Sequence, residues 1–123
     1  MVACTSSSRG GPVPRSGSEL SSFVAEAPAI AQQACDKWAS IWHGDTGAAP
    51  PLADVNSVES VANDATNHDL EFVVLRDHVH FVATAITNGD VGAMATAAER
   101  VDADCAYLKQ GTFRAHINDA GST

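Results

Sequence analysis

Hydrophobic residues recur at spacings of three and four along three segments of the chain, a period typical of helices that bury one face. The first segment begins at Ser18, an expected N-cap that places Glu19 in the first turn. It ends at the Gly- and Pro-rich residues 44–51. Pro28 interrupts the stripe, so this first helix is predicted to be kinked or split there.

The second segment is predicted to be one long helix that begins at a cap residue, Asp54 or Ser57, and ends at about Thr87. Its main apolar stripe contains Val58, Val61, Ala65, Phe72, Leu75, Val79, Val82 and Ile86. A second apolar patch falls on the far side of the same helix and consists of Leu70, Val73, Val74 and Phe81. An apolar patch outside the core stripe predicts an interface for a protein partner.

The third helix is predicted to begin after Asp90, an N-cap that follows the Asn88-Gly89 stop signal, and to end at Lys109. Its stripe contains Val91, Met94, Ala98, Val101, Cys105 and Leu108, while Asp102 and Asp104 are expected on its solvated side. The pattern therefore predicts an all-α, up-down-up three-helix bundle over residues 19–109. Residues 1–18 are expected to be a disordered tether, and residues 110–123 a loose tail.

Three cysteines indicate where the protein is expected to reside. Val2-Ala3-Cys4 matches the end of a bacterial lipobox, so we expect a lipid on Cys4 and a start site within a longer signal peptide. Without such a peptide the chain would stay in the cytoplasm. The remaining cysteines lie on or beside apolar stripes, and parallel first and third helices would bring them to the same end of the bundle. A disulfide between Cys35 and Cys105 is therefore predicted, and it would stabilise the fold by about 4 kcal/mol.

A disulfide persists outside the cytoplasm, which agrees with an exported protein. The alternative is that both cysteines are buried free thiols in a cytosolic protein. The charge also limits the partners: from Glu19 onward the chain has fifteen acidic and five basic residues, a formal charge of −10. Such a domain repels phosphate backbones, so we expect no nucleic-acid partner.

The histidine-rich stretch around residue 70 offers the main candidate chemistry. On one continuous helix, His68 would share a side with Asp64, Glu71 and His78, a set that can hold a divalent metal. His68 could equally be an axial haem ligand, with Met94 or Tyr107 opposite. The third interpretation is a partly buried histidine that binds no cofactor, which is the one we adopt.

Two further motifs resemble sites of known protein families. His78 and His80 with Asp90 are similar to the zinc ligands of JAMM metalloproteases, but a helix would point the two imidazoles about 160° apart. We therefore expect no catalytic residues. Trp42-His43-Gly44 lies between two predicted helices and resembles the W-x-G turn of the WXG100 secreted proteins.

The lipobox ending, the Ser/Gly/Pro tether, the Ala-rich helices and the sequence Val-Asp-Ala-Asp-Cys-Ala-Tyr-Leu at residues 101–108 resemble small actinobacterial lipoproteins with a disulfide-linked helical bundle. The resemblance implies a mature protein that begins at Cys4, is acylated there, and holds its folded domain off the membrane. The function expected from the sequence is a non-enzymatic, membrane-anchored binding or interaction module. The alternatives are a metal or haem carrier that uses His68 and a WXG100-like secreted protein.

Overall fold

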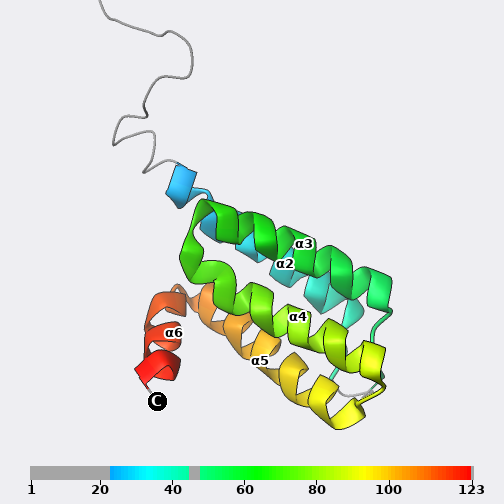
Figure 1. Cartoon of the computed structure of the whole chain (residues 1–123). Coiled ribbons are helices and arrows are strands. Elements are labelled where there is room, and N and C mark those ends of the chain that lie inside the picture. Colours follow the sequence, from blue (N-terminus) through cyan, green and yellow to red (C-terminus); the bar gives the residue numbers. More distant parts are fainter. Residues whose placement is uncertain (1–22, 45–47, 123) are drawn as a thin grey trace, which may run out of the picture.

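The computed structural model describes residues 23–44 and 48–122, and every regular element in that part of the chain is helical. The elements are α2 (Ala27–Ile41), α3 (Leu52–His68), the 3-10 helix η1 (Leu70–Phe72), α4 (Val73–Asn88), α5 (Val91–Gln110) and α6 (Phe113–Ser122). Helices α2 to α5 alternate in direction, and α6 leaves α5 at the end of the bundle that holds the α3–α4 turn (Figure 1). The all-α class is confirmed, while the tether with Cys4 lies outside the described residues.

The predicted second helix is divided at Asp69, so the described chain has four long helices where the sequence predicted three. Asp69 has extended backbone (φ −151°, ψ 118°), and its carboxylate accepts a hydrogen bond from the N–H of Glu71 at 3.2 Å. An aspartate that satisfies a nearby backbone N–H in this way competes with the helical hydrogen bonds and favours a break. The chain then reverses through η1, and α4 packs back along α3 (Figure 1).

The first described helix agrees with the interruption expected at Pro28. Residues 23–25 form a helical turn, a turn follows at Glu26, and α2 begins at Ala27 with Pro28 in its first turn. Proline is tolerated there because a residue in the first turn of a helix needs no N–H for an intrahelical bond. The predicted cap at Ser18 lies outside the described residues.

The core is built from the predicted apolar stripes and is rich in alanine, whose short side chain lets helices approach closely. Its members are buried on all four long helices and on α6, and the principal ones are Ala31, Ala34, Trp38, Val55, Val58, Ala62, Ala65, Phe72, Leu75, Val79, Val82, Met94, Ala98, Val101 and Phe113. None of the described helices is long and apolar enough to cross a bilayer.

Cys35 and Cys105 form the predicted disulfide, which joins α2 to α5 with the two Cα atoms 5.6 Å apart. The relative direction of the two helices differs from the expected one: α2 and α5 are antiparallel, whereas the sequence predicted parallel helices (Figure 1). The cysteines meet because Cys35 lies in the middle of α2 and Cys105 lies five residues before the end of α5, in an antiparallel register. In that register Trp38, three residues after Cys35, donates its indole N–H to Asp102, three residues before Cys105, at 2.7 Å. The indole of Trp42 donates to the other oxygen of Asp102 at 3.0 Å.

Residues after α5 form a packed helix instead of the expected loose tail. Gly111 ends α5 in the left-handed conformation, with φ of +78°, which favours glycine. Phe113 is buried, and its ring stacks on that of Phe72 with the centroids 5.0 Å apart. Arg114 donates to the carboxylate of Glu71 at 2.8 Å, and this hydrogen bond raises the pKa of the guanidinium. These contacts fix α6 against the α3–α4 turn.

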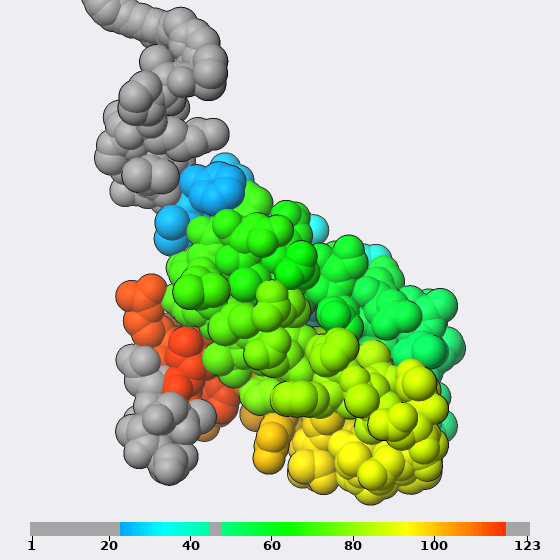
Figure 2. Space-filling model, in the orientation of Figure 1, coloured from blue at the N-terminus to red at the C-terminus, as the bar shows by residue number. Residues whose placement is uncertain are grey.

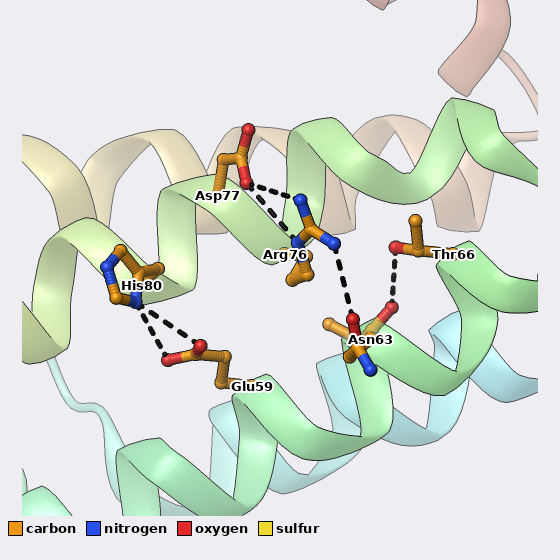
Figure 3. Close-up of polar contacts among 7 residues, drawn as sticks. Glu59, Asn63, Thr66, Arg76, Asp77 and His80 are labelled. Carbon is orange, nitrogen blue, oxygen red and sulfur yellow. Dashed lines mark hydrogen bonds and ion pairs between the residues drawn. The ribbon is translucent and has the colours of Figure 1, made fainter.

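Polar contacts between α3 and α4 occupy an outer face of the bundle (Figure 3). Arg76 donates to Asn63 across the two helices at 3.2 Å and to the neighbouring Asp77 at 3.1 Å. His80 Nδ1 lies 3.2 Å from a carboxylate oxygen of Glu59. Exposed contacts of this kind each contribute little to stability.

Candidate functional site

A buried carboxylate, Asp104 on α5, stands at the centre of the most unusual polar cluster in the described chain. Only 1% of this residue is exposed, although the sequence pattern placed it on the solvated side of its helix. His78 Nδ1 on α4 lies 2.5 Å from Asp104 Oδ2, and His116 Nε2 on α6 lies 2.8 Å from Oδ1. Aspartate is almost never fully buried unless it is paired, and here both carboxylate oxygens are paired.

The pairing with Asp104 determines which ring nitrogen of each imidazole donates a hydrogen bond and which one remains for another partner. An ionised carboxylate only accepts hydrogen bonds, so His78 donates from Nδ1 and His116 donates from Nε2. The second ring nitrogen of each histidine makes no hydrogen bond with any described residue. A buried carboxylate that orients a histidine through one nitrogen is a common way to present the other nitrogen to a ligand.

The position of His116 depends on the helices around it. Its ring stacks on Tyr107 of α5, with the centroids 4.2 Å apart and the planes 9° apart. Phe113, one turn earlier on α6, is buried against Phe72. Three helices therefore build the cluster, and α6 has to be in place for it to form.

Beside the cluster, the surface is hollowed into a groove of about 540 Å³ between α4, α5 and α6, lined by Val74, His78, Arg100, Ala103, Asp104, His116 and Ile117. Figure 2 shows a notch between α6 and the α4–α5 hairpin. A second groove of about 490 Å³ continues along α4 and α5 toward their connecting turn, and Phe81, Ala85, Ala93 and Ala97 are among its walls. Arg100 lines both hollows, which we call together the α4–α5 groove.

Of the ligands predicted for a site around His68, Asp64 lies beside it, with its carboxylate 3.9 Å from Nδ1, while Glu71 and His78 are directed elsewhere. His68 stacks on Phe23, with the centroids 4.1 Å apart, and its Nδ1 lies 3.0 Å from the backbone oxygen of Asp64. Glu71 instead accepts from Arg114, and His78 faces Asp104. Of the proposed axial partners, Met94 is buried in the core and Tyr107 stacks on His116. No group of three or more metal-ligating side chains occurs within the described residues.

The predicted apolar patch is divided by the structure. Val74 and Phe81 line the α4–α5 groove, and 52% of Phe81 is exposed. Leu70, on η1, is 73% exposed but lines neither hollow, and the half-buried Val73 does not line them either. Two of the four residues therefore belong to a concave surface.

Sequence reasoning missed Asp104 and His116 for different reasons. Asp104 follows Val101 by three residues and precedes Leu108 by four, so it occupies the apolar stripe of α5, and an aspartate there is itself a signal of a buried partner. His116 lies in a stretch too short for a helical period to be recognised.

No protein-family model, no curated protein and no solved structure matches this chain significantly.

Proposed function

We propose that the protein is a non-enzymatic binding module of the cell envelope, anchored through a lipid on Cys4, and that it holds a small apolar ligand in the α4–α5 groove. The observation that carries the proposal is the groove itself: in its second hollow, the half-exposed Phe81 and three alanines form the apolar part of the walls, beside the polar side chains of Thr84, Asn88 and Thr96. A buried, doubly paired Asp104 fixes two imidazoles at one end of it. Concave, mostly apolar sites with a few placed polar groups are typical ligand sites.

The chemistry of the walls supports binding as the role of the site. No serine, threonine or cysteine is among the described residues that line the hollow around His78 and His116. The two histidines therefore have no serine, threonine or cysteine side chain in this hollow to activate as a nucleophile, and the aromatic neighbour of His116, Tyr107, stacks face to face on its ring. The two histidines supply ring nitrogens that are held in fixed orientations beside the apolar walls of the groove.

Nile red, a neutral fluorophore that brightens in apolar surroundings, tests the groove directly. We expect the wild-type protein to bind it and Phe81→Glu to lose most of the fluorescence, because the substitution places a charge on the apolar wall. Leu70→Glu is the matched control, since Leu70 is equally apolar and more exposed but lies outside the groove. Equal binding by the two variants, or no binding by the wild type, would refute the proposed site.

The envelope location has a separate test in native cells. We expect Cys35 and Cys105 to resist alkylation until a reductant is added, because the cytoplasm keeps thiols reduced and the compartments outside it do not. Mass spectrometry of the N-terminal peptide should find acyl chains on Cys4. Free thiols together with an unmodified Cys4 would place the protein in the cytoplasm.

A further inference from the structure

We infer that the ligand of the α4–α5 groove is a medium-chain fatty acid whose carboxylate pairs with Arg100 and whose alkyl chain lies along the apolar walls toward Asp90. This inference rests on the proposed function and names the class of ligand for that same groove. It follows from the charge, the polarity and the length of the described surface.

Arg100 differs from the other arginines of the described domain. Arg76 donates to Asp77 and Asn63, and Arg114 donates to Glu71. Arg100 forms no hydrogen bond or ion pair with any described residue, although the chain carries fifteen acidic residues against seven basic ones. An unpaired guanidinium on the wall of a groove offers the planar, two-pronged donor set that a carboxylate matches.

The wall on one side of Arg100 suits an alkyl chain. Phe81 and Ala85 of α4 and Ala93 and Ala97 of α5 give this hollow most of its apolar lining, and Thr84, Asn88 and Thr96 add polar side chains to it. Asp90 closes its far end, where its carboxylate caps α5 by accepting from the N–H of Ala93 at 3.0 Å. Ten residues of helix separate Asp90 from Arg100, so this wall of the groove is about 15 Å long.

The charges at the two ends set the direction of the ligand. A carboxylate at Asp90 would meet a like charge, whereas at Arg100 it meets an opposite one. Beyond Arg100 lies Asp104, but His78 and His116 cover both of its oxygens, so the ligand's carboxylate would meet imidazole rings there instead of a bare carboxylate. The head group therefore belongs at Arg100 and the chain terminus near Asp90.

Dodecanoate and dodecanol, which share a chain and differ in the head group, separate the carboxylate contribution from that of the chain. We would measure both by displacement of Nile red and by calorimetry, below their micelle concentrations. Wild-type protein should bind dodecanoate about tenfold more tightly than dodecanol, as expected for one charge-assisted carboxylate contact. Raising the salt concentration should weaken only dodecanoate.

Arg100→Gln should reduce the affinity for dodecanoate to that for dodecanol. The affinity for dodecanol should stay unchanged, and that result would show that the groove of the variant is intact. Lys109→Gln is the matched control, because Lys109 is another exposed cation of α5 with no partner among the described residues and lies outside the groove. Equal affinity of the wild type for the two ligands, or equal losses in both variants, would overturn the inference.

The failure of this inference is distinguishable from the failure of the proposed function. If Nile red binds the groove but neither twelve-carbon ligand displaces it, the fatty-acid assignment is wrong and the binding groove stands. If Nile red does not bind the wild-type protein, both the binding groove and the fatty-acid assignment are wrong.

Discussion

Replacing Asp104 with alanine is expected to lower the free energy of unfolding by about 3 kcal/mol, because the substitution removes two charge-assisted hydrogen bonds at once. Both imidazoles would lose their hydrogen bond to Asp104, and α6 would lose its polar contact with α5 through His116. Urea denaturation gives the loss in stability, and hydrogen exchange of α6 amides shows whether that helix detaches. We expect α6 to lose protection well before α4 or α5.

Two further variants separate the buried pairing from charge alone. Asp104→Asn keeps one carbonyl oxygen and should show an intermediate loss, since an amide accepts from one imidazole where the carboxylate accepts from two. Asp77→Ala removes an exposed aspartate whose partner is the neighbouring Arg76, and it should change stability by no more than about 0.5 kcal/mol. If Asp104→Ala were as mild as Asp77→Ala, the cluster would not contribute to stability as its geometry indicates.

Removing the disulfide with Cys35→Ala and Cys105→Ala is expected to lower the free energy of unfolding by about 4 kcal/mol, because the closed loop of 70 residues restricts the unfolded chain. The dependence of stability on urea should also steepen, since an unfolded chain without the crosslink exposes more surface. Both quantities come from one denaturation curve.

Reductant supplies the control for this prediction. Reduced wild-type protein should unfold at the same urea concentration as the double variant, and the double variant should not respond to reductant. A wild-type curve that is insensitive to reductant would mean that the crosslink between α2 and α5 is absent in solution.

The apolar stripes were predictable because hydrophobic residues recur at helical spacing, and the cysteine pair was predictable because the chain has only three cysteines. Helical spacing places Val58, Leu75 and Val101 in the core whatever the connections are. The disulfide was correctly predicted, but from a parallel arrangement of helices that the fold does not have. Cys35 and Cys105 are the two cysteines of the described residues, and both lie on the buried sides of their helices, which is why a wrong topology led to the right pair.

The division at Asp69 was not predictable from periodicity, and without it the pairing of Asp104 with His78 was not predictable either. The spacing of apolar residues on either side of Asp69 is compatible with a continuous helix, and only a local hydrogen bond to the N–H of Glu71 decides the turn. Once α3 and α4 are separate, His78 faces α5 instead of sharing a side with His68. The ligand set expected from an unbroken helix therefore lies on different parts of the bundle.

The bond between Cys35 and Cys105 makes the intervening chain a covalent ring, which contains α3, α4 and most of α5. A single proteolytic cut anywhere inside that ring leaves both pieces attached to each other. Helix α6 lies outside it, after Gly111, and carries His116. A cut at that junction would release the helix that covers Asp104 while the remaining bundle kept its crosslink, so a protease can remove residues after Cys105 or before Cys35 but no segment inside the ring by a single cut.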